Sequence, residues 1–252
     1  MIPKIIHYCW FGGKEKPQDV LSCIESWKKF LPDYEIKEWN ESNYDINKCQ
    51  YMADAYKEKK WAFVSDYCRI DVVNQYGGLY LDTDVEVIKS FDPLLKEQFF
   101  CGYEASEPKA SPKAINFGLA FGSEASSVVL SEILEEYHKL SFYKPDGNFN
   151  LITCPTLQTK VLERHGVTPN GENQKVNGIT VFSEEYFCPM NYLTGKTNIT
   201  PNTYSIHHYS ATWMPWYYSA EQRFWHFFGI KNLKILLRIH NLFKYGTIRS
   251  WV

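Results

Sequence analysis

WAFVSDYCRIDVVNQYGGLYLDTDVEV, residues 61–87, contains the pattern that decides the fold. Its first half carries apolar side chains at helical spacing, and the glycine pair 77–78 predicts where that helix ends. The apolar run 79–81 then predicts a short buried strand, which is followed by two carboxylates one residue apart, Asp82 and Asp84. The stretch therefore predicts a helix that leads into a core strand with an acidic end.

The two acids have two explanations. An isolated Asp-x-Asp pair occurs about once by chance in a chain of this length, and it usually marks a solvated turn. Alternation along a strand, however, sends Asp82 and Asp84 to the same side, and hard cations such as Mg²⁺ and Mn²⁺ prefer oxygen ligands. Asp66 and Arg69 lie three residues apart on the preceding helix, where they form either a surface ion pair or part of the same crevice. The residues alone leave both explanations open.

Periodicity predicts further strands and helices that alternate through the first half of the chain. The expected strands are residues 4–10, 34–39, 85–88, 99–104, 115–122, 178–182 and 204–209. The expected helices, besides the one over 61–76, are 17–30, 51–60, 126–140 and 155–162. This alternation predicts an α/β layer fold with a largely parallel sheet.

Composition excludes several classes of protein. The 252 residues are 44% hydrophobic and 22% charged, which is typical of a globular protein with a sizeable core. A net charge of -2 argues against a dedicated nucleic-acid binder. The 7 cysteines show no paired spacing, which favours reduced thiols and a cytoplasmic location. The N-terminal residues do not read as a secretory signal, and no apolar run is long enough to span a membrane.

The last part of the chain differs from the rest, which predicts a domain over 1–217 and a basic amphipathic tail over 218–252. Residues 222–252 contain six Lys or Arg and no acid, and a helical projection puts their Leu, Ile and Phe on one broad side. Such a helix either lies on an anionic membrane surface or packs its apolar side on the domain.

Three segments resemble one known family. SDYCRIDVVNQYGGLYLDTDV (65–85) resembles the core motif of glycosyltransferase family 32, IPKIIHYCWFGG (2–13) is similar to its first strand, and YSIHHYSATW (204–213) is similar to its C-terminal His/Trp segment. That family includes yeast mannosyltransferases, many bacterial capsule and O-antigen enzymes and, more distantly, the glucosyltransferase domains of clostridial toxins.

The resemblance implies a fold and a reaction. The fold is of the GT-A type, an α/β structure with a Rossmann-like nucleotide half and a mixed central sheet. The reaction is a retaining, Mn²⁺- or Mg²⁺-dependent transfer of a hexose from a nucleotide sugar, most simply a UDP-sugar. The implied acceptor is a glycan or a lipid-linked oligosaccharide in capsule polysaccharide biosynthesis, on the cytoplasmic side and near the membrane.

The resemblance also implies roles for individual residues. Trp10 looks like the aromatic residue that stacks on the donor base, with the backbone of Cys9 and Phe11 at the base edge. Asn116 looks like a contact to the donor sugar or the acceptor, and Trp213 like a cover over sugar or phosphate.

The implied catalytic set is Asp66, which accepts bonds from ribose or sugar hydroxyls, Arg69, which grips the sugar or phosphate, and Asp82. The implied metal ligands are Asp82, Asp84 and a histidine from the late strand. His207 and His208 are adjacent, so a strand sends only one of them into the site, and we expect His208.

Two other functions fit the same residues. A metal-dependent nucleotidyl or phosphoryl transferase also uses paired acids. A glycan-binding module would use the abundant aromatic residues, 17% of the chain, without catalysis.

Overall fold

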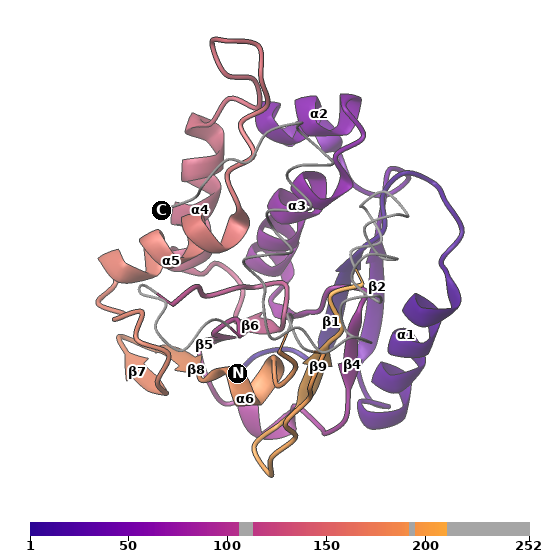
Figure 1. The fold of residues 1–252 in the computed structure, drawn as a ribbon, viewed down its shortest axis with the longest axis vertical. Helices are drawn as coiled ribbons and strands as arrows, with labels where there is room; N and C mark the ends of the chain where they lie inside the picture. The colour runs from indigo at the N-terminus through magenta and orange to yellow at the C-terminus, as the bar shows by residue number, and fades with distance from the viewer. Residues whose placement is uncertain (106–112, 192–194, 211–252) are drawn as a thin grey trace, which may run out of the picture.

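The computed structural model describes residues 1–105, 113–191 and 195–210 (Figure 1). Trp213 and the tail 218–252 lie outside the described residues. In chain order the strands are β1 (Ile5–Cys9), β2 (Glu35–Trp39), β3 (Gly78–Tyr80), β4 (Val85–Val87), β5 (Phe99–Gly102), β6 (Phe121–Ser123), β7 (Gln174–Val176), β8 (Ile179–Phe182) and β9 (Ser205–His207). The α-helices are α1 (Gln18–Phe30), α2 (Gln50–Lys57), α3 (Trp61–Tyr76), α4 (Val128–Lys139), α5 (Cys154–Arg164) and α6 (Glu184–Phe187), with 3₁₀ turns at Ile46–Lys48 and Asp92–Leu94.

The main sheet is mixed. Its strand order is β2-β1-β3-β6-β5-β8-β7, and β4 pairs with β9 in a separate two-stranded sheet. The pairs β2–β1, β1–β3 and β5–β8 are parallel, whereas β3–β6, β6–β5 and β8–β7 are antiparallel. The expected α/β class with a mixed sheet is confirmed, and five of the seven strands run in one direction, with β6 and the edge strand β7 opposed to them.

Helices cover the two faces of the sheet and enclose two apolar cores. Helix α3 packs on β1, β3 and β6, and its sides contact α2 and α4. Helix α1 packs on β4 at the other face (Figure 1). Tyr80 belongs to the core cluster under α3, and its neighbour Leu79 belongs to the cluster under α1. Alternation along β3 therefore supplies both cores from one strand.

The glycine pair after α3 is required by the backbone. Gly77 and Gly78 have φ of 66° and 109°, a region that favours glycine, and a Cβ on Gly78 would lie 2.7 Å from the Ile5 carbonyl oxygen. The carbonyl of Gly77 accepts a hydrogen bond of 2.8 Å from Nε2 of the buried His7. Burial lowers the pKa of His7 to about 4, so this histidine is a neutral structural group.

The segment 115–122 differs from the expected strand. Ile115 forms only an isolated bridge with Tyr103, residues 117–119 make a turn, and the strand β6 begins at Phe121. The short elements β7 and α6 were also not expected from the sequence. The turn at 117–119 matters because it brings Gly118 against the acidic end of β3.

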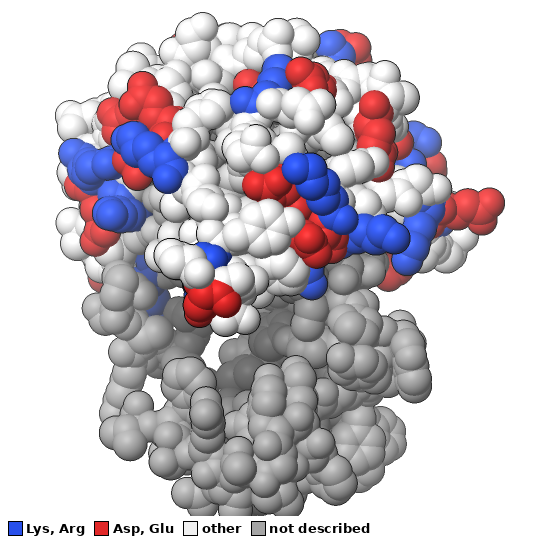
Figure 2. Space-filling model, turned by 90° about the horizontal axis from the view of Figure 1, so that it is seen from above, with Lys and Arg blue, Asp and Glu red and all other residues white. Residues whose placement is uncertain are grey.

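The described surface is mixed in charge. Figure 2 shows Lys and Arg beside Asp and Glu on the face it presents, without an extended area of one sign. None of the helices in the described ranges has the length and apolar character that crossing a membrane requires.

Candidate active site

The acidic pair leaves the sheet beside the end of β1. β1 and β3 are parallel, with Ile6 opposite Leu79 and His7 opposite Tyr80. The Leu81 backbone N–H continues this pairing with a bond of 3.2 Å to the His7 carbonyl. Because both chains run in the same direction, the segments that follow β1 and β3 emerge at the same edge of the sheet, where open α/β sheets bind ligands.

Arg69 holds two carboxylates together beneath this edge. Its Nη2 lies 3.0 Å from Asp66 Oδ1 and 3.2 Å from Asp82 Oδ1. The Tyr80 hydroxyl donates a bond of 3.0 Å to the same oxygen of Asp82, and the Arg69 guanidinium carbon lies 4.9 Å from the centre of the Tyr80 ring. Asp66 and Arg69 are 6% and 4% exposed, so they form a buried network and not a surface ion pair.

The ionisation of this network follows from its burial. Burial raises the pKa of Asp66 to about 6, opposed by the Arg69 charge and by a hydrogen bond from the Cys154 thiol. Burial also raises the pKa of Asp82, again opposed by Arg69. Burial acts to lower the pKa of Arg69, but the nearby charges of Asp82, Tyr80 and Asp66 raise it well above its usual value. Arg69 is therefore a permanent cation shared by two acids.

Asp82, Asp84 and His207 form a group that suits a divalent cation. One ligand atom from each lies within 4.8 Å of the others, and His207 Nε2 lies 3.2 Å from Asp84 Oδ1. Adjacent ligands of an octahedral ion with bonds of about 2.1 Å are about 3 Å apart. The His207 Nδ1 is buried without a hydrogen-bond partner in the described part of the chain. Two carboxylates and an imidazole at these separations fit a divalent cation.

The structure brings His207, and not His208, to the acids. In the β4–β9 ladder Val85 is opposite His207. The next side chain points away, and His208 Nε2 lies 2.9 Å from Glu86 Oε2. The structure thus places His207 beside the acids where His208 was expected, because the register of β9 on β4 decides which of the two side chains faces them.

The segment after β9 also fixes Asp84 from the backbone. The His208 N–H donates to the Asp84 carbonyl at 2.9 Å, and the Ser210 N–H donates to Asp84 Oδ2 at 2.9 Å. Tyr209 between them has a φ of 52°, which is uncommon for a residue with a side chain. Strain of this kind persists where surrounding contacts impose it, and here those contacts orient a candidate metal ligand.

The turn that follows Asn116 packs against Asp82. Asn116 Oδ1 accepts a bond of 2.7 Å from the Gly118 N–H, and the Gly118 carbonyl accepts a bond of 3.1 Å from the Asp82 N–H. A Cβ on Gly118 would overlap the Asp82 carboxylate and would lie 2.9 Å from Arg69 Nη1. Glycine at this position lets the main chain approach both charged groups.

The residues expected at the donor base lie at the end of β1. Cys9 and Phe11 are buried in the core under α3, so only their backbone is available at this edge. Trp10 is partly buried against the other core, its Nε1 donates to the Lys14 carbonyl at 2.6 Å, and Lys16 Nζ lies 5.8 Å from its ring centre. Among the described contacts none joins Trp10 to the acids, so its stacking role stays a prediction.

Sequence reasoning missed four residues of this site. His207 was weighed against its neighbour, whereas Gly118 was read as part of a strand. Cys154, at the start of α5, donates to Asp66, and its only sequence signal is the Pro that follows it at the start of a helix. Glu104 supplies a further carboxylate near His207 and ends the segment predicted as a strand.

Comparisons with known proteins find similarity to glycosyltransferases. Residues 17–100 match the family described as glycosyltransferase sugar-binding region containing DXD motif, a range that includes Asp66, Arg69, Asp82 and Asp84. Inositol phosphoceramide mannosyltransferase 3 of Schizosaccharomyces pombe is 31% identical over 123 residues, which are 46% of this chain and 32% of that protein. The matched part thus spans about a third of that relative.

Two further relatives cover more of the chain. An uncharacterised glycosyltransferase of Acanthamoeba polyphaga mimivirus is 25% identical over 223 residues, or 85% of each chain. The solved structure of the PaToxG glycosyltransferase has a TM-score of 0.50 and 19% identity over 65% of this chain and 69% of that one, which supports the fold. Residues 17–100 thus resemble a DXD-motif glycosyltransferase region, and the α/β fold of the chain is of the GT-A type.

Proposed function

We propose that this chain transfers a hexose from a nucleotide sugar, most simply a UDP-sugar, to a glycan or lipid-linked acceptor with retention of configuration. The observation that carries the proposal is the convergence of Asp82, Asp84 and His207 within 4.8 Å, directly beside the buried Arg69. The nearest alternatives are nucleotidyl or phosphoryl transfer and glycan binding without catalysis.

The charges of the site favour a metal-dependent reaction. Asp66, Asp82 and Asp84 face one permanent cation, Arg69, together with the His207 imidazole. A nucleoside diphosphate would add further negative charge to this excess of acids. A divalent cation held by Asp82, Asp84 and His207 would offset both, and when bound it would stabilise the charge that develops on the departing diphosphate.

Side chains of the protein supply the other interactions that the reaction requires. Arg69 is nearly buried between its two acids, so we propose that it orients Asp82 toward the cation and Asp66 toward sugar or ribose hydroxyls. Trp10, at the end of β1, is proposed to stack on the base. Attack by the acceptor hydroxyl on the front face of the sugar needs no protein nucleophile, and we assign no general base.

Turnover of nucleotide sugars is expected only with a divalent cation. The protein should release nucleoside diphosphate from one of UDP-glucose, UDP-galactose, UDP-N-acetylglucosamine or GDP-mannose in the presence of Mn²⁺, and EDTA should abolish the release. GDP-mannose is included because one relative is named a mannosyltransferase. Release of pyrophosphate would indicate nucleotidyl transfer, and glycan affinity that persists in EDTA without turnover would indicate a binding module.

A peripheral membrane position rests on the sequence of the tail alone. We propose that residues 218–252, rich in Lys and Arg, hold the enzyme at an anionic cytoplasmic surface near a lipid-carried acceptor of capsule polysaccharide synthesis. The protein is expected to sediment with vesicles that contain anionic phospholipid and to do so less at high salt. Equal sedimentation with anionic and neutral vesicles, or none with either, would contradict this position.

A further inference from the structure

Glu104 lies just past the end of β5, on the side of the chain that faces the site. Tyr103 forms an antiparallel bridge with Ile115, and both side chains enter the core, 1% and 0% exposed. On either side of this bridge, the Glu104 N–H donates to the Ala114 carbonyl at 2.9 Å and the Asn116 N–H donates to the Gly102 carbonyl at 3.1 Å. Alternation therefore sends Glu104 and Asn116 to the same face, as diagonal neighbours within side-chain reach.

The groups around Glu104 belong to the site. The side chains of Asn116 and Tyr209 lie near its carboxylate and act on its pKa as hydrogen-bond donors. Asn116 is oriented for this by its other end, because its Oδ1 accepts the Gly118 N–H that lies over Asp82. The Tyr209 ring packs edge-on against the His207 ring at 4.3 Å. Glu104 thus sits between the turn behind Asp82 and the segment that carries His207.

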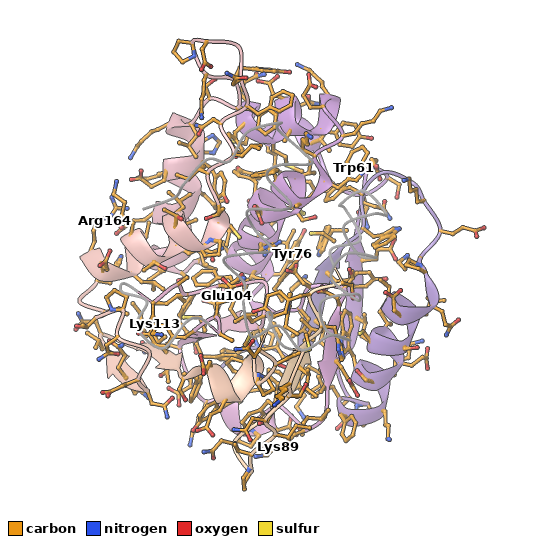
Figure 3. The ribbon with its side chains drawn as sticks, in the orientation of Figure 1. Trp61, Tyr76, Lys89, Glu104, Lys113 and Arg164 are labelled. Atoms are coloured by element: carbon orange, nitrogen blue, oxygen red, sulfur yellow. The ribbon has the colours of Figure 1, made fainter. Side chains whose placement is uncertain are left out.

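Glu104 is partly exposed and forms no ion pair with another residue in the described ranges. The residue is partly exposed, unlike Asp66 and Arg69, and Figure 3 shows it over the middle of the fold, whereas Lys89 and Arg164 lie at the rim. None of the ion pairs found among the described residues includes Glu104. Burial raises its pKa, and the charge of His207 and the bonds from Asn116 and Tyr209 act against this rise.

We propose that Glu104 binds a hydroxyl group of the transferred hexose. Its two protein partners are neutral donors, and a carboxylate has about four acceptor positions, so acceptor capacity remains for a ligand. A phosphate is excluded as that ligand by like charge. The group of atoms that suits the cation consists of Asp82, Asp84 and His207 without Glu104. A sugar hydroxyl is a neutral donor and therefore suits the remaining acceptor positions of the Glu104 carboxylate.

The inference rests on the proposed function. Its test compares the affinity for a nucleotide sugar with the affinity for the matching nucleoside diphosphate. Glu104→Gln keeps the size of the side chain but removes the charge. In the presence of Mn²⁺ this variant is expected to bind the preferred nucleotide sugar of the panel above about 10-fold more weakly, because a hydrogen bond to a charged acceptor is lost. Its affinities for the matching nucleoside diphosphate and for Mn²⁺ alone are expected to equal those of the unmodified protein.

The control is Glu97→Gln, which changes a buried carboxylate that accepts bonds from Lys175 and Thr180 outside the site. It should leave all three affinities unchanged. Equal loss of nucleoside diphosphate or Mn²⁺ affinity in Glu104→Gln would show that Glu104 only positions its neighbours and would overturn the inference, as would unaltered nucleotide-sugar binding. If the unmodified protein binds no nucleotide sugar, the proposed function itself fails, and this inference fails with it.

Discussion

Asp84→Ala is expected to lower nucleoside diphosphate release by about 1000-fold or more, because it removes a candidate cation ligand from the group that would stabilise the leaving diphosphate. Its carboxylate lies 3.2 Å from His207 Nε2 and accepts the Ser210 N–H, so no other described side chain is placed to replace it. The affinity for Mn²⁺, measured by equilibrium dialysis, should fall with the rate. The fold is expected to persist, because the backbone bond from His208 to the Asp84 carbonyl does not depend on the side chain.

The histidines provide a matched control for this prediction. His207→Ala should impair Mn²⁺ binding and turnover, whereas His208→Ala, which removes a contact to the exposed Glu86, should leave both within about two-fold of the unmodified protein. The two residues are adjacent and carry the same side chain, so the comparison isolates orientation. A larger loss in His208→Ala, or an active Asp84→Ala, would contradict the metal site described above.

The location of the acids was predictable from the sequence because it depends on local rules. The end of a core strand at the ligand-binding edge of an α/β sheet indicates where Asp82 and Asp84 lie, although both follow β3 and do not belong to a strand. Burial of Asp66 and Arg69 was not predictable in the same way. Polar and apolar side chains are spread around α3 without forming one apolar face, so its sequence does not indicate which polar residues face the interior.

Two other features depend on contacts between distant segments. The choice between His207 and His208 follows from the register of β9 on β4, which are about 120 residues apart in the chain. The run 115–122 has the composition of a strand, yet it turns at residues 117–119 so that Gly118 approaches Asp82 and Arg69. Tertiary packing overrode local propensity there.

Arg69→Met is expected to lower the free energy of unfolding by about 3–5 kcal/mol at neutral pH, because it leaves the buried Asp66 and the partly exposed Asp82 without their cation. Asp66 and Asp82 then have only neutral partners, Cys154 and Tyr80. The matched control is Arg164→Met, which removes a partly exposed arginine that pairs with Glu132 and Glu136 and should cost less than about 1 kcal/mol. Urea denaturation measures both variants.

The loss of stability in Arg69→Met should depend on pH through the protonation of Asp66. Asp66 has a pKa of about 6 in the folded protein, above the value of about 3.9 for an unfolded chain. The folded state therefore holds the proton more tightly, and stability falls as pH rises between these values. Without Arg69 the folded pKa rises further, so Arg69→Met should be less destabilised at about pH 5 than at about pH 8.

Gly118→Ala separates the charge of Arg69 from its geometry. The added methyl group overlaps the Asp82 carboxylate and presses on Arg69 Nη1 but leaves every charge in place. It should reduce turnover and destabilise the fold by about 1–3 kcal/mol, as overpacking does, with little change between the two pH values. If Arg69→Met unfolds at the same urea concentration as Arg164→Met, or is equally destabilised at both pH values, the buried carboxylates do not depend on Arg69. A stronger pH dependence in Gly118→Ala than in Arg69→Met would likewise assign the effect to packing and not to charge.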